Sequence, residues 1–434
     1  FWGCKSLKHI IWNAVDFEEP CMMFNYLSIQ DSWSYNRARI EDIIFGDKVK
    51  NIPNTICSGM TGLEEVVIPA SVEIIGNGAF DGAGIKKVIL NEGIKEIGPA
   101  AFRNTNLSEI NLPESVEIIG ADALDASGIK QLYIPKNVQS YYGGAKGIEK
   151  LIWDAKDCKS VNQMQFYNLA NFKALEIGPN VRKLPTFFMY YCNSLEEVEI
   201  PENVEEIGDY CFMASSTIRK VDMSKSNLKR IGAYAFCQCK KLDSITIQKV
   251  DTICEFAFFD YNDTKFVEIG SVKCIGKNAF NGSAIKKLIL PADLVFIDDF
   301  AFPWMESDGE VTCYADNPPK LGEDVFYNSY EKGTLYVQGK SVSKYKADEK
   351  WGEFNNIIAI PGTEQLFTIR CEEAEGGRIS GEGNFKEGEE CELTAYSDEG
   401  YKFMYWQKAD GSTIKDNPYK FVVTNEISLK AVFQ

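Results

Sequence analysis

One phrase of sequence returns along most of this chain. It runs from Leu63 to Phe80, and altered versions of it run from Ile85 to Phe102, from Leu107 to Leu124 and from Leu195 to Phe212, with a period of 22 to 24 residues. Self-similarity at a fixed period of this length marks a solenoid, in which each repeat packs only against its neighbours. The repeats are therefore expected to stack as coils, an architecture that seldom encloses a catalytic pocket.

Each repeat contains two extended pieces and a turn. A Leu-x-x-Val-x-Ile segment such as Leu63–Ile68 alternates with period two, which predicts a short strand that a following Pro or Gly ends. A Val-x-x-Ile-Gly piece such as Val72–Gly76 predicts a second short strand, and Gly-x-x-Ala-Phe predicts an irregular or helical turn. Successive coils are expected to pair their first strands in one long parallel sheet and to line the interior with the Phe rings.

The repeat weakens towards the end of the chain. From about residue 310 the sequence predicts a terminal cap, closed by Trp351 and Phe354, because the last coil of a solenoid needs its core covered. After a Pro-Gly linker, alternating segments separated by Gly-rich turns predict a separate β-rich module. We therefore expect a solenoid domain over 1–360 and a small β-rich domain over 361–434.

The charge of the chain excludes two classes of partner. It has 63 acidic and 46 basic residues and a net charge of −17. Nucleic acids and anionic membranes bind basic surfaces, so neither is an expected partner. No apolar run approaches the ~18 residues that a membrane-spanning helix requires.

The thirteen cysteines follow the repeat. Cys4, Cys192 and Cys239 each precede by three residues the apolar residue that opens a strand, so we expect thiols packed inside the coils rather than a disulfide framework. In the tail, Cys371 and Cys391 fall on the inward register of strands expected to be neighbours. A cross-strand disulfide and a pair of buried thiols both fit this placement.

Residues with catalytic or metal-binding chemistry form no convincing constellation. His9 is the only histidine and lies near Cys4, but Cys4 occupies a core position of the repeat. No Cys-x-x-Cys pair is present, so no zinc or other metal site is predicted. Asp298 and Asp299 are consecutive and diverge, whereas glycosidases oppose two carboxyls across a cleft. The sequence predicts no catalytic residue and no cofactor, and hence no enzyme.

The strand register points to a candidate contact surface. In each Leu-x-x-Val-x-Ile segment the residue before the final Ile faces outward. These residues are mostly apolar in the first half of the chain and mostly acidic in the second, and an exposed apolar stripe usually marks an interaction site. The alternative is that β-branched residues simply favour strands and that neighbouring lysine stems cover them. The candidate stripe consists of Ile44, Val67, Ile89, Tyr133 and Ile152.

The full repeat phrase, Leu-x-x-Ile-x-Ile-Pro-x-x-Val-x-x-Ile-Gly-x-x-Ala-Phe-x-x-Cys-x-x-Leu, resembles the BspA-type leucine-rich repeat from residue 1 to about 360. The tail resembles a divergent internalin B-repeat module through Gly377-Arg-Ile, Gly400-Tyr-Lys-Phe and Leu429-Lys-Ala-Val-Phe433. This resemblance implies a leucine-rich repeat solenoid, with a parallel β-sheet on one face and short strands and irregular or helical turns on the other, followed by a small β-rich domain.

The resemblance also implies a function. It implies a secreted or surface-attached bacterial protein that adheres to host matrix proteins or to other bacteria, and it brings no catalytic residues with it. Because residues 1–7 match the end of a repeat, we expect an anchoring segment to precede them. The alternative is a glycan-binding module of a polysaccharide-capture system, in which sugar rings stack on exposed aromatic side chains. The aromatic residues that suggest this alternative are Trp12, Trp33, Tyr35, Tyr133, Tyr141 and Tyr142.

Overall fold

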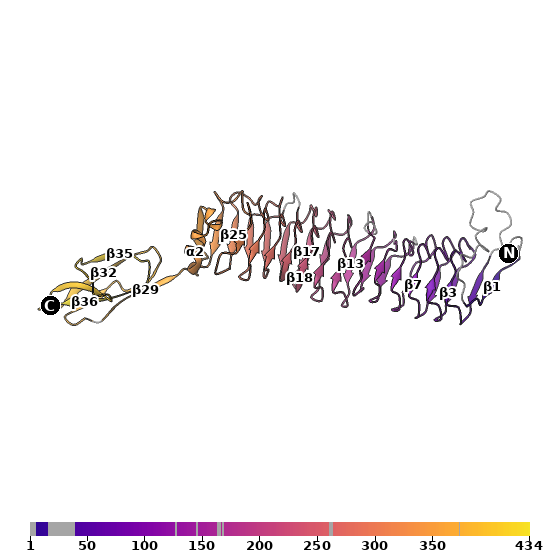
Figure 1. The fold of residues 1–434 in the computed structure, drawn as a ribbon, viewed down its shortest axis with the longest axis horizontal. Helices are drawn as coiled ribbons and strands as arrows, with labels where there is room; N and C mark the ends of the chain where they lie inside the picture. The colour runs from indigo at the N-terminus through magenta and orange to yellow at the C-terminus, as the bar shows by residue number, and fades with distance from the viewer. Residues whose placement is uncertain are drawn as a thin grey trace. The chain divides into compact units, whose positions relative to one another are not determined.

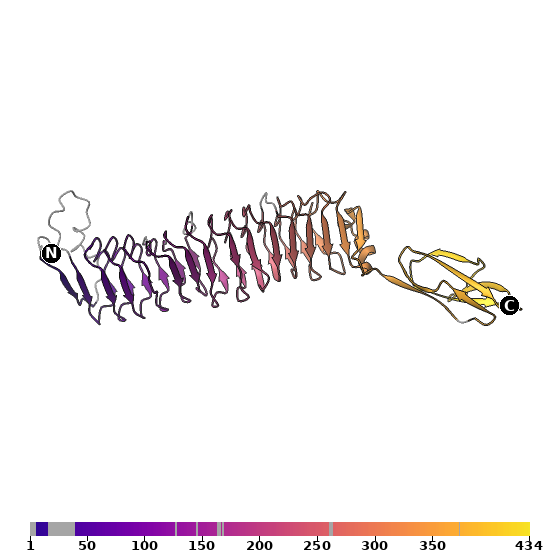
Figure 2. The same cartoon turned by 180° about the vertical axis from the view of Figure 1, so that it is seen from behind.

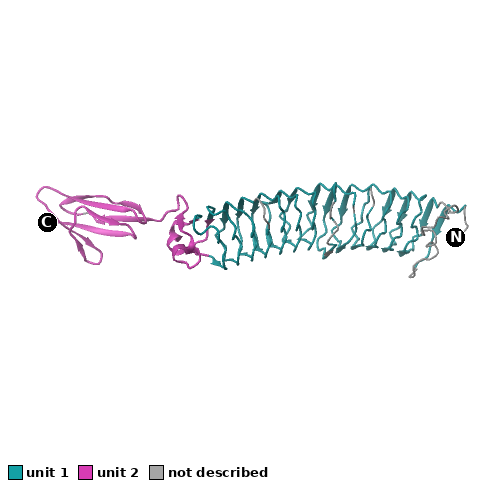
Figure 3. Ribbon diagram, turned by 90° about the horizontal axis from the view of Figure 1, so that it is seen from above, with its two compact units in different colours: residues 1–311, 319–334 teal, residues 312–318, 335–434 magenta. Residues whose placement is uncertain are grey.

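The computed structural model describes residues 6–15, 40–125, 128–144, 146–162, 166, 169–259, 264–372 and 374–434. Cys4, Trp33 and Tyr35 lie outside these ranges. The chain forms two compact units, one of Phe1–Val311 with Pro319–Thr334 and one of Thr312–Pro318 with Leu335–Gln434 (Figure 3).

The first unit is a stack of coils, as the repeat predicts. Most coils give a short strand to a first face, where strands of successive coils pair in parallel over several segments (Figure 1). The strands of this first face are β1 (His9–Trp12), β2 (Asp42–Phe45), β4 (Glu65–Ile68), β6 (Lys87–Leu90), β9 (Gln131–Ile134), β11 (Lys150–Trp153), β13 (Ala174–Ile177), β15 (Glu197–Glu199), β17 (Lys220–Met223), β19 (Ser244–Ile247), β21 (Phe266–Ile269), β23 (Lys287–Leu290) and β25 (Glu310–Cys313).

The second extended piece of each coil forms a second face. Its strands also pair in parallel, in one six-stranded and one seven-stranded sheet with an interruption between β12 and β14. These strands are β3 (Asn51–Ile52), β5 (Ile74–Ile75), β7 (Glu96–Ile97), β8 (Ile118–Ile119), β10 (Ser140–Tyr141), β12 (Ser160–Val161), β14 (Lys183–Leu184), β16 (Glu206–Ile207), β18 (Leu228–Ile231), β20 (Val250–Ile253), β22 (Cys274–Ile275), β24 (Phe296–Ile297) and β26 (Lys320–Leu321).

The prediction of one long sheet on the first face is wrong. The first face is interrupted between β2 and β4, between β6 and β9 and between β13 and β15. Between β6 and β9 the expected strand at 107–112 does not form. Leu107, Ile110 and Leu112 nevertheless remain buried. This coil therefore keeps its core packing without a strand of its own.

The core of the stack is a column of Phe rings, as predicted. Phe80 and Phe102 stack with ring centroids 5.3 Å apart. In the later coils Phe212, Phe236 and Phe258 stack at 5.1 and 5.2 Å. All five rings are buried, as is Phe280. The coils stack on one another (Figure 2), and the buried rings mean that each coil covers the apolar face of the next.

The turns that carry these rings are irregular rather than helical. Their backbones bond from coil to coil, for example from the Phe80 N–H to the Ala101 carbonyl at 2.8 Å. In many coils the residue two positions before the core Phe has a positive φ, including Tyr210 (56°), Tyr234 (57°) and Phe256 (55°). Their rings form a second, half-buried column with Phe187, at centroid distances of 4.8 to 5.0 Å. The sequence did not predict this column.

The second unit contains a cap segment with a small core of its own. Its elements are β27 (Thr334–Val337), η1 (Gly339–Ser341), α2 (Val342–Ala347), η2 (Trp351–Glu353) and β28 (Asn356–Ala359). Tyr345, Trp351 and Phe354 are buried, with Tyr345 and Trp351 edge to face at 5.3 Å. The Tyr345 hydroxyl donates to the Ala315 carbonyl at 2.9 Å.

The tail forms the predicted β-rich module. One sheet has the order β31-β29-β36-β33-β34 and the other β30-β32-β35. Trp406, Leu393 and Leu429 are central to the core that these strands bury. The strands are β29 (Leu366–Glu372), β30 (Gly377–Ser380), β31 (Gly383–Lys386), β32 (Glu390–Ser397), β33 (Phe403–Lys408), β34 (Thr413–Ile414), β35 (Tyr419–Val422) and β36 (Ile427–Phe433).

Candidate interaction surface

The predicted stripe lies on the outward side of the first face. Ile44, Val67 and Ile89 are 53%, 47% and 38% exposed, whereas their strand neighbours Val66 and Ile68 are buried. This alternation follows from the pleat, which turns successive side chains to opposite sides of a strand. Three consecutive strand-bearing coils thus present β-branched apolar side chains to solvent.

Strand register brings part of the stripe together. Val67 lies directly opposite Ile89 in the β4–β6 pair, and Tyr133 lies opposite Ile152 in the β9–β11 pair. The two groups are separated by the coil that carries the exposed Asn111. The stripe is therefore two apolar segments rather than one continuous surface.

Ile11 extends the first segment and was missed by the sequence reasoning. It lies opposite Ile44 in the β1–β2 pair and is 68% exposed, the highest value along this row. The signal was present, because Ile11 occupies the same place in its segment that Ile44 and Val67 occupy in theirs. The sequence around Ile11 departs from the repeat with Pro after the strand, so the equivalence of Ile11 to Ile44 and Val67 was not recognised.

A shallow hollow of about 440 Å³ adjoins the first segment. It lies where β2 and β4 are not paired, and Ile44, Phe45, Val67 and Pro69 are among its lining residues. The interruption of the first face thus adds concave apolar surface to a row that is otherwise flat. Concave apolar surface suits the insertion of a partner's side chain.

Tyr133 and Ile152 are half-buried and so less accessible than the other stripe residues. The Tyr133 hydroxyl approaches Glu114 Oε1 at 3.1 Å and Asp154 Oδ2 at 3.3 Å. Burial, followed by the nearby Glu114 carboxylate, raises the pKa of Tyr133 above its usual value. This phenol therefore stays neutral and is held in place by two carboxylates.

The acidic half of the row is largely paired with lysines. Glu176 and Glu199 are exposed, with Lys150 Nζ 2.7 Å from Glu176 and Lys225 Nζ 3.5 Å from Glu199. Exposed pairs of this kind contribute about 0–1 kcal/mol each. This half of the first face therefore presents to solvent a polar surface whose acidic charges are largely paired with lysines, in contrast to the apolar first segment.

The described aromatic residues behind the glycan alternative do not all lie at the surface. Tyr141 is fully buried, because it takes the inward place on β10 that Ile119 takes on β8. Its ring meets Trp153 edge to face at 5.7 Å. Tyr142 is 37% exposed and Trp12 is half-buried. The expected exposed aromatic group is therefore wrong at Tyr141.

The repeat cysteines have the predicted place, whereas the tail pair does not. Cys192, Cys211 and Cys239 are buried, and Cys192 and Cys211 are free thiols. Cys371 and Cys391 are also free, and they do not lie on neighbouring strands, since β29 and β32 belong to different sheets. Both pack in the core between those sheets. Burial raises the pKa of Cys371 to about 12.

Among the described residues, no group of three or more His, Cys, Asp or Glu side chains is arranged to hold a metal ion. His9 is exposed, and its Nδ1 lies 3.7 Å from Asp42 Oδ2 across the β1–β2 pair. None of the helices in the described part of the chain is long and apolar enough to span a membrane.

Comparison with solved structures returns bacterial leucine-rich repeat proteins. One from Bacteroides ovatus is 18% identical, with a TM-score of 0.36 over 81% of this chain and 92% of that chain. The pneumococcal vaccine antigen PcpA is 17% identical, with a TM-score of 0.34 over 83% of this chain and 91% of that chain. Curated protein sequences give no match.

Family models match both parts of the sequence. The BspA type leucine rich repeat region matches residues 27–145, 139–262 and 229–345, and the divergent InlB B-repeat domain matches residues 367–434. Both resemblances noted in the sequence are thereby confirmed. The chain belongs to the BspA-type leucine-rich repeat family of bacterial surface proteins and ends in a divergent InlB B-repeat domain.

Proposed function

We propose that this chain is a non-enzymatic interaction protein of the bacterial cell surface that binds a protein partner through the first face of its solenoid. The partner belongs to the host matrix or to the surface of other bacteria. The observation that carries this proposal is the row of exposed apolar side chains at Ile11, Ile44, Val67 and Ile89. Exposed apolar rows of this kind usually mark interaction surfaces.

Free energy favours covering this row. Fully burying an exposed Val or Ile side chain is worth about 1.5–3 kcal/mol, so covering these partly exposed residues contributes favourable free energy that offsets part of the entropy cost of association. The hollow beside Ile44 and Val67 supports the proposal, because it offers a place for one anchoring side chain. The stripe residues Tyr133 and Ile152 are proposed as a second, weaker contact.

We also propose that residues 1–360 and 361–434 are separate folding domains. The solenoid then presents the contact surface, while the β-rich module acts as a spacer or as a second binding module. Limited proteolysis tests the boundary. Cleavage near residue 361 that releases two protease-resistant fragments supports it, whereas a first cleavage inside either part contradicts it.

The binding proposal predicts the effect of replacing Ile44, Val67 and Ile89 together with Thr. Thr keeps the β-branched shape that favours strands but puts a hydroxyl where the partner needs apolar surface. We expect adhesion to the matrix protein or bacterial surface that the wild type binds to weaken at least about tenfold, with an unchanged thermal midpoint. Biolayer interferometry on immobilised matrix proteins and whole bacteria measures this.

The matched control replaces Glu176, Glu199 and Thr246, which occupy the same register in later coils, with Ser. This variant is expected to bind like the wild type. Equal adhesion by both triple variants contradicts the assignment of the contact surface. Binding on a glycan array, together with binding to protease-treated cells and no binding to purified matrix proteins, supports the glycan alternative instead.

A further inference from the structure

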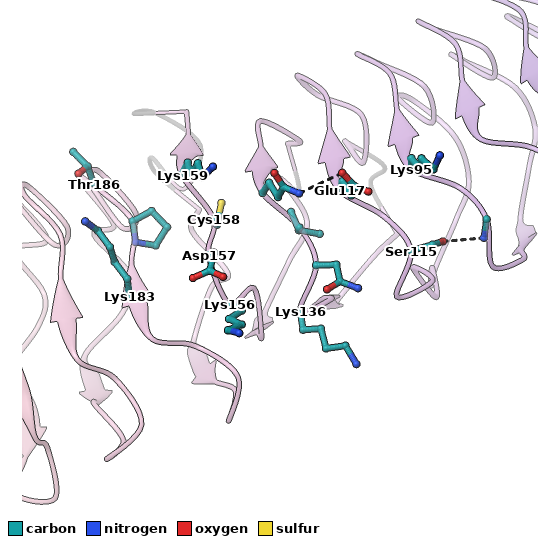
Figure 4. Close-up of a pocket in the computed structure, with 15 residues that line it drawn as sticks. Lys95, Ser115, Glu117, Lys136, Lys156, Asp157, Cys158, Lys159, Lys183 and Thr186 are labelled. Atoms are coloured by element: carbon teal, nitrogen blue, oxygen red, sulfur yellow. Dashed lines mark hydrogen bonds between the residues drawn. The ribbon is translucent and has the colours of Figure 1, made fainter.

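A larger hollow, of about 1070 Å³, lies on the second face of the solenoid (Figure 4). It opens where the second face is interrupted, since β12 ends one sheet and β14 begins the next. Lys159, beside β12, and Lys183, in β14, line it from the two sides. The full set of charged lining residues is Lys95, Lys136, Lys156, Lys159, Lys183, Glu117 and Asp157.

The charge of this hollow is opposite to that of the chain. Five lysines against two carboxylates line it, whereas the whole chain carries a net charge of −17. The backbone fixes their order, because the Lys156 N–H donates to the Lys136 carbonyl at 3.0 Å and so sets these two residues on neighbouring coils. Neighbouring strands lie about 4.8 Å apart, and like charges placed opposite one another are destabilising.

Three of these lysines lack an ion pair of the kind that many lysines of the solenoid form. Such pairs join a lysine to a carboxylate of the adjacent coil, as with Lys86 and Glu64 at 2.9 Å and Lys273 and Asp251 at 3.0 Å. Within the hollow, Lys95 and Lys183 follow this pattern with Glu73 and Glu206, each at 3.0 Å.

The three lysines are Lys136, Lys156 and Lys159. All are exposed, and across the described ranges none lies within ion-pair distance of a carboxylate. Three lysines without an ion-pair partner thus line one concavity. An anion bound there gains charge-assisted hydrogen bonds.

The lining favours an acidic polypeptide over an acidic sugar. No aromatic ring occurs among the described residues that line the hollow, so it offers no platform on which a sugar ring can stack. The two end strands β12 and β14 instead border it, and sheet edges accept an extended peptide through backbone hydrogen bonds. Peptide backbone and carboxylate side chains together match what the site presents.

We propose that this hollow binds an extended acidic segment of a polypeptide, with its Asp and Glu carboxylates on Lys136, Lys156 and Lys159. The site lies on the second face, whereas the apolar stripe lies on the first, so this inference goes beyond the function proposed above. It also stands if the stripe proves to have no partner.

The test uses a fluorescently labelled oligoglutamate peptide and the full chain in an anisotropy titration. The wild type is expected to bind this peptide, with an affinity that falls as NaCl screens the charges, and not to bind an oligoglutamine peptide of equal length. The variant K136E/K156E/K159E is expected to bind oligoglutamate at least about tenfold more weakly.

The matched control is K240E/K241E/K249E, which makes the same change in net charge at three exposed lysines of later coils. It is expected to retain peptide binding, as is the stripe variant with Thr at Ile44, Val67 and Ile89. Equal losses in the two lysine variants, or no binding by the wild type, overturn the proposal. Preferential binding of heparin or polyphosphate over oligoglutamate at the same lysines overturns the choice of a polypeptide.

Discussion

Single rings decide how the coils stack. Phe236 is buried between Phe212 and Phe258, whereas Phe256 belongs to the half-buried outer column and adopts a positive φ of 55°. Bulky residues rarely adopt this left-handed conformation, so ring stacking with Tyr234 at 4.8 Å offsets a backbone cost. The two columns therefore contribute differently to stability.

Replacing Phe236 with Ala tests the inner column. The substitution removes a ring packed on both sides and leaves a cavity, so we expect a loss of about 3–5 kcal/mol in the free energy of unfolding. Replacing Phe256 with Ala removes only half-buried stacking, at about 0.5–1.5 kcal/mol per ring pair. Urea denaturation followed by circular dichroism measures both. A larger loss for Phe256 than for Phe236 contradicts the assignment of the core.

The inner column was predictable from sequence and the outer one was not. A Phe at the same place in most repeats indicates a core position, because a solenoid repeat buries its shared apolar residues. Tyr210, Tyr234 and Phe256 each precede such a Phe by two residues, a signal that the sequence carries. They lie at a turn position with positive φ, which bulky residues seldom occupy. Local conformational propensity therefore gave no reason to expect a structural role for these residues, and ring stacking supplies that role.

At the scale of strands and turns, ion pairs connect neighbouring coils. Glu73 bridges two coils, with Lys95 Nζ at 3.0 Å and Lys50 Nζ at 3.2 Å. The hydrogen bond from Lys95, and then that from Lys50, lowers the pKa of Glu73 below its usual value. A carboxyl whose pKa is lower in the folded state stabilises that state above its unfolded pKa, and the effect is lost as pH falls through the folded pKa.

The substitution Glu73→Gln is expected to lower the thermal midpoint at neutral pH. The difference between wild type and variant should close as the pH falls below the usual range of a glutamate pKa, because the wild-type carboxyl is then protonated and uncharged. Glu202→Gln, at an exposed glutamate in a turn, serves as the control and should change the midpoint little at any pH. A difference for Glu73→Gln that persists unchanged in acid contradicts the role given to this ion pair.

The pattern of strands was predictable, but its interruptions were not. Period-two alternation and the following Pro or Gly indicated nearly every strand of the first face. The segment 107–112 has the same apolar spacing, yet it forms no strand. Whether a segment pairs as a strand depends on the segments of the two adjacent coils as well as on its own residues. The sequence of one repeat does not contain this information about its neighbours.

At the scale of the whole molecule, one candidate surface follows from the regular repeat and the other from an interruption of it. The apolar row follows directly from the repeat, because each coil places one residue at the same outward position. The lysine-lined hollow arises where the second face is interrupted, and its lysines come from coils between 95 and 183. In the sequence each of these lysines is an ordinary solvated charge, and only the stacking of coils brings them to one place.

The most direct test of the account removes one complete coil. Tyr234 and Phe256 occupy equivalent places in successive coils, so deleting residues 234–255 joins two coils in register. The account predicts that this shortened chain unfolds cooperatively, keeps the β-type circular dichroism spectrum and loses little thermal stability, because neighbouring repeats contact only each other. Deleting residues 234–244, half a coil, should break the register and unfold the adjoining coils. Equal tolerance of the two deletions, or equal loss of structure in both, would contradict a solenoid held together by coil-on-coil packing.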